Sequence, residues 1–176
     1  MKNWILPLIV AALTAVCAWH ATLALTTRVL MAGAIHRISS RGGAGMNAMS
    51  YARLATPENQ PIVRPSPDLA YSSCPFDLSD GPLLITYVPV PGRYSSLSVF
   101  DARTDALFVR NDAQTGGLPL KLVVAQAGQK VPQGIETVRV SYAKGIALVR
   151  LLLADPSEIA KLDAVRRQSS CATIRG

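Results

Sequence analysis

The fold is decided by residues 136–155, which read ETVRVSYAKGIALVRLLLAD. In the first half, Val138, Val140 and Tyr142 alternate with polar residues, and this period of two predicts a half-buried β-strand. In the second half, residues 146–153 form a nearly continuous apolar run, as expected for a buried strand. The two halves therefore predict consecutive strands of a β-rich domain.

The chain before this stretch repeats the pattern of short apolar runs separated by turn residues. The runs cover residues 83–88, 94–100, 107–110 and 120–124. Turn signals recur about every 8–14 residues, a spacing typical of an antiparallel sandwich or barrel. Of these we favour a mainly β domain over residues 61–176 that forms an antiparallel, jelly-roll-like β-sandwich. Residues 42–60 are mixed in composition and rich in turn residues, and we expect a linker there.

The chain after this stretch predicts one C-terminal helix that closes the domain. Asp155 is a helix N-cap, Pro156 follows it at the first helical position, and Glu158 completes a capping box. The apolar face consists of Ile159, Leu162 and Val165. The residues expected to face water or to complement the helix dipole are Lys161, Arg166 and Arg167.

The first 41 residues predict a membrane anchor. Residues 4–25 contain no Asp, Glu, Lys or Arg and span about 33 Å as a helix, enough to cross the hydrocarbon core of a bilayer. Residues 26–38 continue as a basic, amphipathic extension at the interface. The small residues at 32–34 lie too far downstream for signal cleavage, so we expect an uncleaved signal anchor.

The charges are unevenly distributed along the chain. There are 18 basic and 11 acidic residues, and the first 41 residues hold four of the basic residues and none of the acids. This basic segment predicts contact with anionic lipid headgroups. A nucleic-acid partner is not expected, because no basic stripe is interleaved with aromatic residues.

The sequence limits the chemistry of the domain. Both histidines, His20 and His36, belong to the anchor, which removes Ser-His-Asp and Cys-His activation and nearly all zinc sites from the domain. No phosphate-binding loop or dinucleotide motif is present. We therefore expect no cofactor and no metal site, and an enzyme is the less favoured interpretation.

The remaining candidate residues each have a structural alternative. Six polar residues are candidates for ligand binding: Arg64, Asp68, Tyr71, Arg93, Tyr94 and Asp101. An aspartate beside a turn commonly caps its own backbone, and a strand-end arginine is commonly an ion-pair partner. Cys74 and Cys171 form one disulfide in an oxidising compartment, or remain two unrelated thiols.

Residues 64–111 resemble a known family. The segment RPSPDLAYSS at 64–73, the segments FDLS at 76–79 and GRYSSL at 92–97, and the pair Phe100-Asp101 before Thr104 resemble the domain-of-unknown-function family 1254 (DUF1254), in particular its short, membrane-anchored alphaproteobacterial members. The resemblance extends more weakly to residue 168 and implies an exported β-sandwich without an established reaction. Larger relatives carry a second β domain, of the DUF1214 type, which this chain lacks. Ser66, Pro67 and Leu69 replace polar residues of the common family pattern.

The location follows from two conflicting signals. Arg28, Arg37 and Arg41 follow the membrane span and place the domain in the cytoplasm by the positive-inside rule. The two pairable cysteines and the export implied by the resemblance favour the periplasm, which we expect. The chain is thus predicted to be a single-pass protein of the bacterial inner membrane.

Three functions are compatible with these observations. The favoured one is a non-catalytic binding or accessory module that meets lipid through residues 4–25 and a membrane-protein partner or a DUF1214-type domain through the β domain. The second is a ligand-binding or enzymatic domain that uses Asp68, Tyr71, Arg93 and Asp101 together with a two-domain partner. The third is a structural envelope protein.

Overall fold

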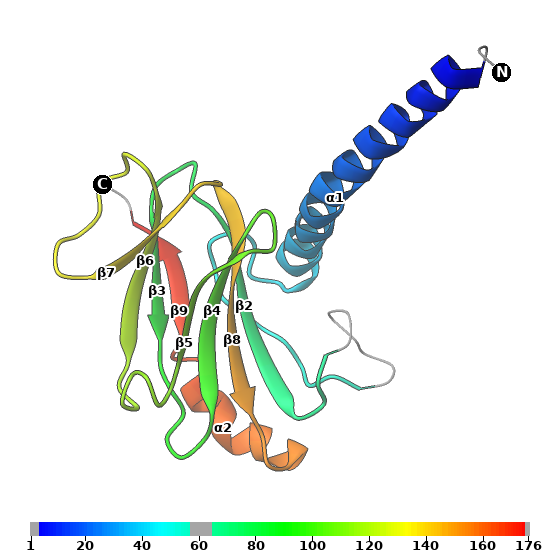
Figure 1. The fold of residues 1–176 in the computed structure, drawn as a ribbon. Coiled ribbons are helices and arrows are strands. Elements are labelled where there is room, and N and C mark those ends of the chain that lie inside the picture. Colours follow the sequence, from blue (N-terminus) through cyan, green and yellow to red (C-terminus); the bar gives the residue numbers. More distant parts are fainter. Residues whose placement is uncertain (1–3, 57–64, 175–176) are drawn as a thin grey trace.

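The computed structural model describes residues 4–56 and 65–174 of the 176-residue chain. Figure 1 shows a long helix, α1 (Ile5–Arg41), that projects from a body built of two β-sheets. The strands are β1 (Ser50–Tyr51), β2 (Leu69–Asp77), β3 (Leu83–Tyr87), β4 (Ser95–Asp101), β5 (Ala106–Asn111), β6 (Leu120–Gln126), β7 (Glu136–Val140), β8 (Lys144–Leu152) and β9 (Ser170–Thr173). The five-stranded sheet has the order β1-β2-β8-β4-β5, and the four-stranded sheet has the order β7-β6-β3-β9.

The strand β8, from the stretch that decides the fold, lies at the centre of the five-stranded sheet. It pairs with β2 over nine residues and with β4 over seven, antiparallel on both sides. The residues of one face, at positions 145, 147, 149 and 151, are buried, and on the other face Ile146 is buried while Leu148 and Arg150 are half-buried, which fits the nearly continuous apolar sequence of a central strand. The strand prediction is confirmed for this segment, although Tyr142 lies between β7 and β8 rather than within a strand.

One strand pair departs from the predicted antiparallel arrangement. β7 runs parallel to β6, in the register Leu122↔Glu136 to Gln126↔Val140. Residues 127–135 connect the two strands, and nine residues reach about 30 Å when extended, enough to return the chain to the start of β6. The expectation of a wholly antiparallel domain is therefore wrong at this edge, and the four-stranded sheet is mixed.

The two sheets share one hydrophobic core. Leu83, Ile85 and Tyr87 enter it from the four-stranded sheet, and Phe76 and Leu97 enter it from the five-stranded sheet. All five side chains are fully buried. The Tyr87 hydroxyl shares a hydrogen bond of 2.7 Å with the Ser95 hydroxyl, so the one phenol of this group keeps a partner inside the core.

A disulfide crosses this core. The structure joins Cys74 in β2 to Cys171 in β9, so the bond links the two sheets. Cys74 is fully buried and Cys171 is 8% exposed. The bond closes a loop across 97 positions of sequence.

The C-terminal helix covers one end of the sheets, at the bottom of Figure 1. Asp155 accepts a hydrogen bond from the backbone N–H of Ser157, as the capping motif predicted, and the 3₁₀ turn η2 (Pro156–Glu158) leads into α2 (Ile159–Arg166). The predicted apolar face packs on a second small core of Ala70, Val90, Leu151 and Leu153. The chain does not end with this helix, because β9 follows it and pairs with β3.

One side chain of α2 contradicts the predicted polar face. The Arg166 side chain is only 4% exposed, and it donates hydrogen bonds to the carbonyl oxygens of Ala52 and Tyr71. Its charge is paired with Asp163. The prediction that Arg166 faces water is wrong, because the segment after α1 folds against α2 and supplies carbonyl acceptors there.

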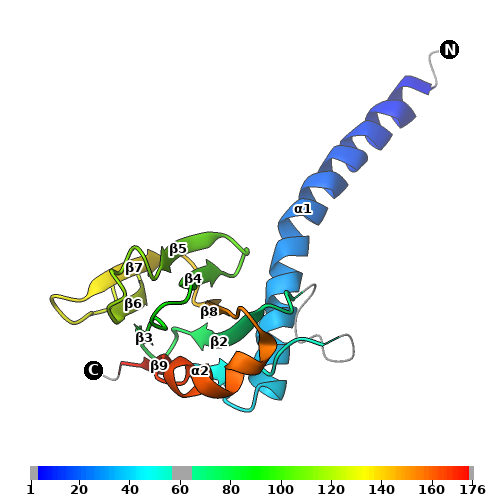
Figure 2. The ribbon, with the colours of Figure 1, turned by 90° about the horizontal axis from the view of Figure 1, so that it is seen from below.

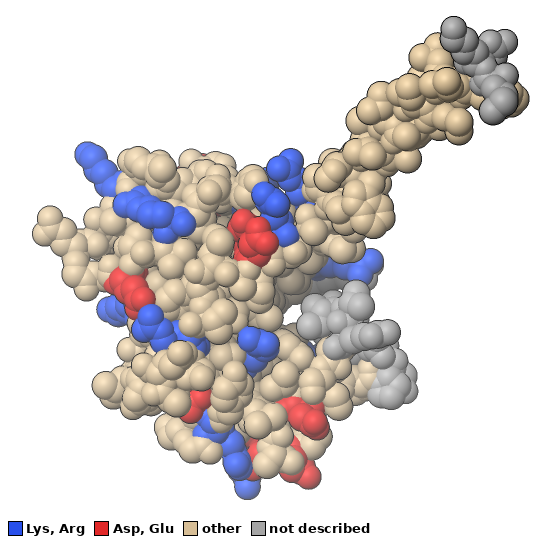
Figure 3. Space-filling view, viewed as in Figure 1, with Lys and Arg blue, Asp and Glu red and all other residues tan. Residues whose placement is uncertain are grey.

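Helix α1 is one unbroken element of 37 residues. At 1.5 Å per residue it is about 55 Å long. Within Ile5–Ser40, an 18-residue window has a mean hydropathy of 2.0 and none of it is buried. The outer half of the helix shows no Lys or Arg in Figure 3. By length and composition this helix suits a membrane anchor, and it equally suits a signal sequence.

The end of α1 is fastened to the domain. The hydroxyl of Ser50 donates a hydrogen bond of 2.9 Å to the carbonyl oxygen of Gly42, the C-cap of the helix. Asn47 has a positive φ of 56°, and its side-chain amide exchanges hydrogen bonds with the backbone of Asp77. The part of the predicted linker that the structure describes is thus ordered and contains strand β1, which pairs with β2.

Candidate functional site

A groove lies between the domain and the second half of α1. Its volume is about 450 Å³, and Figure 2 shows α1 passing along the β2 side of the body. The helix contributes Arg28, Met31, Ala32, Ile35, His36 and Ser39, and the domain contributes Ala102, Tyr142 and Lys144. The helix positions these six side chains because residues three or four apart share one face.

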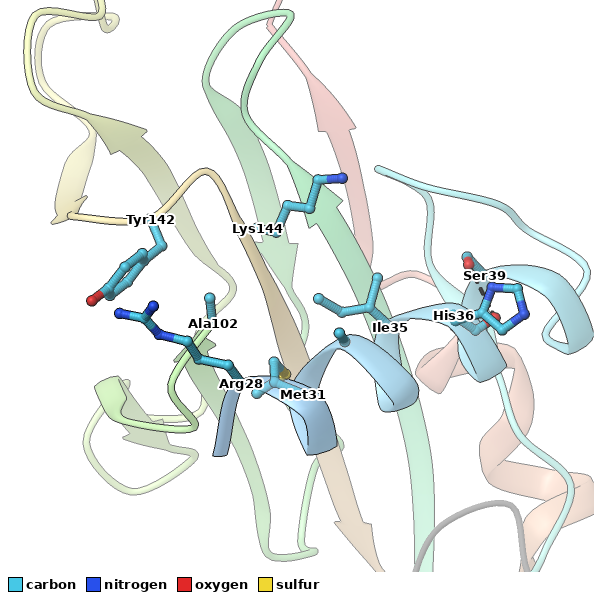
Figure 4. Close-up of a pocket in the computed structure, with 9 residues that line it drawn as sticks. Arg28, Met31, Ile35, His36, Ser39, Ala102, Tyr142 and Lys144 are labelled. Carbon is cyan, nitrogen blue, oxygen red and sulfur yellow. Dashed lines mark hydrogen bonds between the residues drawn. The ribbon is translucent and has the colours of Figure 1, made fainter. Parts of the chain in front are cut away.

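The end of the groove nearest the apolar half of α1 holds an arginine over an aromatic ring. The guanidinium of Arg28 lies 5.7 Å from the centre of the Tyr142 ring, within cation–π range. In Figure 4 the Arg28 side chain points from α1 toward Tyr142. Hydrogen bonding to the Tyr142 side chain also raises the pKa of Arg103 above its ordinary value. Two arginines therefore meet one tyrosine at this end.

The domain wall of the groove holds a paired lysine. Lys144 Nζ lies 3.3 Å from Asp77 Oδ2. Although burial raises the pKa of Asp77, hydrogen bonds from Ser79 and the charge of Lys144 lower it overall, so this carboxylate is ionised at neutral pH. The charge of Lys144 is therefore largely neutralised, unlike that of Arg28.

The far end of the groove is less charged. Figure 4 shows the His36 ring pointing away from Arg28 and Tyr142. The Ser39 hydroxyl donates a 3.2 Å hydrogen bond to the carbonyl oxygen of His36. Between the two ends, Met31 is 7% exposed and Ile35 is half-buried, so the middle of the groove is apolar.

A polar row crosses the outer face of the five-stranded sheet. Tyr71, Arg150 and Ser96 are direct neighbours on β2, β8 and β4 and therefore share one face. Arg150 Nη2 donates to the Ser98 hydroxyl at 3.1 Å, and the Tyr71 hydroxyl accepts a 3.0 Å hydrogen bond from the backbone of Ser66. Arg150 Nε and the Ser96 hydroxyl are buried without a hydrogen-bond partner within the part of the chain that the structure describes.

A family model described as "Protein of unknown function (DUF1254)" matches residues 46–173. The chain belongs to the DUF1254 family. The match covers both sheets and α2 but leaves out α1. No curated protein matches this DUF1254 chain.

Two solved structures resemble this DUF1254 chain. The VPA0106 protein from Vibrio parahaemolyticus is 14% identical with a TM-score of 0.68, over 87% of this chain and 37% of that one. A putative uncharacterized protein from Burkholderia cenocepacia is 15% identical with a TM-score of 0.49, over 88% of this chain and 41% of that one. The DUF1254 chain therefore spans less than half the length of either protein. The similarity to the Vibrio protein shows that the two share a fold and nothing about function.

The structure brings only some of the predicted ligand residues together. Tyr71 is in the polar row beside Arg150, and Tyr94, which is 47% exposed, lies two residues before Ser96 and so on the same face. Asp101 is five residues beyond Ser96, about 17 Å along β4. The five predicted residues that the structure of this DUF1254 chain describes thus do not form one site.

The other predicted residues have local structural partners. Asp101 accepts hydrogen bonds from the backbone N–H groups of Arg103 and Asp105, which is the turn-capping alternative. Arg93 forms an ion pair with Glu158 of η2. Asp68 is exposed, and its carbonyl oxygen accepts from the N–H of Leu153. Arg64 lies outside the described residues.

The groove residues were missed as a group by reasoning from the sequence. Arg28 carries a usable signal, because it is the first charge after the apolar run of α1. Tyr142 and Lys144 carry none, since the connection between β7 and β8 and the first residue of β8 meet α1 only through the tertiary fold. Among the residues that the structure describes, no three His, Cys, Asp or Glu side chains are grouped as a metal site.

Proposed function

We propose that this DUF1254 chain is a membrane-anchored accessory module that holds a β domain beside the bacterial inner membrane and binds a partner there. The observation that carries the proposal is the continuity of α1. The helix runs without a break from its apolar half to Gly42, which is fastened to Ser50. Met31 is buried against the domain, so the second half of the helix is part of the folded structure. A segment packed in this way supports a retained anchor rather than a removed signal sequence.

The proposal also covers the topology of α1 and the side of the membrane on which the domain lies. α1 is an uncleaved signal anchor that crosses the membrane once, and the domain is a jelly-roll-like β-sandwich on the periplasmic side. The bond between Cys74 and Cys171 supports an oxidising compartment. Arg28 and Arg37, which follow the apolar half of α1, are the opposing signal.

An exposed sheet edge supports a protein partner. β5 is the last strand of the five-stranded sheet, and its Arg110 forms an ion pair with Glu136 of β7, whereas Leu107 and Val109 on it are 38% and 52% exposed. Apolar side chains beside unpaired backbone groups favour pairing with another chain. Because the VPA0106 protein, which shares the fold, is more than twice as long, we propose that a DUF1214-type β domain or another membrane protein occupies this edge.

Purification of the intact protein from membranes tests the proposal. The tagged full chain, extracted in mild detergent, is expected to retain a partner in near-stoichiometric amount. Val109→Asp should release this partner, whereas Leu118→Asp should not, because Leu118 is 67% exposed but lies outside the strands. Recovery of the chain alone, or extraction of the chain from membranes by alkaline carbonate, would refute the proposal.

A second candidate function is supported by the polar row. Arg150 Nε and the Ser96 hydroxyl lack partners in the described structure, and Arg150 lies between Ser96 and Tyr71, so a small polar ligand or ordered water gains two hydrogen bonds there. Arg150→Met should then abolish ligand binding while leaving partner retention intact. Partner retention that falls together with ligand binding would contradict two separate functions.

A further inference from the structure

We infer that the groove between α1 and the domain binds the headgroup of one anionic phospholipid, with the phosphate at Arg28 and Tyr142. The inference rests on the proposed function, because it requires α1 to span a membrane. It goes beyond that function by assigning the groove a ligand of stated chemistry.

The height of the groove along α1 supports this ligand. The apolar run ends at Leu25, and Arg28 follows three residues later, about 4.5 Å further along the helix. The headgroup region on each side of the hydrocarbon core is roughly 5–7 Å thick. When the apolar run fills the core, Arg28 and the Tyr142 ring beneath it therefore lie within the headgroup layer.

The charge of the groove is complementary to a phosphate. The nine lining residues include Arg28 and Lys144 but no Asp or Glu. Lys144 is paired with Asp77, and the neighbouring Arg103 faces Asp105 at 4.0 Å. Arg28 has no ion-pair partner within the described residues, and its guanidinium lies over the Tyr142 ring. An unneutralised guanidinium beside a phenol offers a phosphate several hydrogen-bond donors and no repelling carboxylate on the groove wall.

The apolar middle of the groove distinguishes a lipid from a free phosphate. Beyond Arg28, on the side away from the apolar half of α1, the helix lines the groove with Met31, Ala32 and Ile35. A free phosphate makes no use of such walls, whereas the headgroup glycerol of phosphatidylglycerol, which lies beyond the phosphate on the side away from the hydrocarbon core, buries carbon atoms against them. The volume of about 450 Å³ falls within the range of small-molecule sites.

Native mass spectrometry of the full chain in mild detergent tests the inference. With phosphatidylglycerol and phosphatidylcholine added in equal amounts, we expect one phosphatidylglycerol per chain, at least about fivefold favoured over phosphatidylcholine. Arg28→Gln should remove this preference. The matched control is Arg37→Gln, which removes the same charge from the same helix at an exposed position outside the groove.

The possible outcomes separate the inference from the proposed function. Equal binding of both lipids, an equal loss in Arg37→Gln, displacement by soluble glycerophosphate, or a lipid-free dimer of the chain would each overturn the inference. If alkaline carbonate leaves the protein in the membrane, each of these outcomes rules out the lipid site in the groove and leaves the proposed anchor intact. Release by carbonate instead overturns the anchor on which both depend. Because Arg28 is exposed, its Gln variant should keep the wild-type circular dichroism spectrum, which confirms that a lost preference is not misfolding.

Discussion

Replacing the buried arginine of α2 should be far more harmful than replacing its neighbour. Arg166 and Arg167 are adjacent, both pair with Asp163, and both lie near the Tyr51 ring. They differ in exposure, since the Arg166 side chain is 4% exposed and that of Arg167 is 55% exposed. Met at each position removes the same charge and keeps a long apolar stem, so the pair isolates the effect of burial.

The size of the effect follows from the hydrogen bonds that are lost. Arg166 donates to the carbonyl oxygens of Ala52 and Tyr71, each at 3.1 Å. The Tyr71 carbonyl keeps a hydrogen bond from the N–H of Ala52, whereas the Ala52 carbonyl has no second donor within the described residues. Leaving the part-buried Ala52 acceptor without its donor costs about 1–3 kcal/mol, and the second lost bond, which is buried, adds about 1 kcal/mol. Arg166→Met should therefore cost about 2–4 kcal/mol, against at most about 1 kcal/mol for Arg167→Met.

Urea unfolding of the full chain in detergent measures this difference. Both tryptophans, Trp4 and Trp19, lie at or in α1, so the transition of the domain should be followed by far-UV circular dichroism. Similar slopes with a lower midpoint for Arg166→Met indicate a change in stability alone. A difference between the two variants below about 1 kcal/mol would refute the reasoning, because it would mean that burial of Arg166 adds nothing beyond a surface ion pair.

Three further predictions concern other parts of the domain. Gly145→Ala places a Cβ 2.2 Å from the carbonyl oxygen of Phe100, so it should cost at least about 1–3 kcal/mol in urea unfolding, while Gly33→Ala, with open space around it, should not destabilise. Peptide mapping without reductant should recover Cys74 linked to Cys171, and replacing both by Ala should cost up to about 4.7 kcal/mol; two free thiols would contradict the bond. Burial raises the pKa of Asp163, but hydrogen bonds from Arg167 and Arg166 lower it overall below its ordinary 3.8. The ionised Asp163 side chain therefore stabilises the folded state above pH 3.8, and this stabilisation is lost as the pH falls through the folded pKa. The difference in the free energy of unfolding between wild type and Asp163→Asn should accordingly shrink in acid.

The parts of the fold that were predictable carry their own local signal. The apolar run of β8 and the Asp155 cap needed only neighbouring residues to be recognised. The strands β1 and β9 have two and four residues, too few for any periodicity, and they exist because β2 and β3 offer them unpaired edges. The parallel direction of β7 could not be predicted either, because it depends on the path of residues 127–135 and not on the sequence of the strand itself.

The candidate site was less predictable than the fold. A polar residue in sequence does not reveal its partner, and Arg93 and Asp101 proved to be held by Glu158 and by a local turn. The groove combines α1 with a connection that follows it by more than 100 positions, and no local pattern joins Arg28 to Tyr142. Long-range packing of this kind is visible only once the fold is known.

The continuity of α1 fixes the helical phase between its two halves. A continuous helix turns by about 100° and rises by 1.5 Å with each residue. Deleting one residue between Ala21 and Thr27 would leave the sequence of both halves intact, yet it would rotate the whole domain by about 100° around the helix axis relative to the side chains of the apolar half. The number of residues in this short segment, independent of their identity, thus determines which side of the domain is aligned with a given side chain of the apolar half.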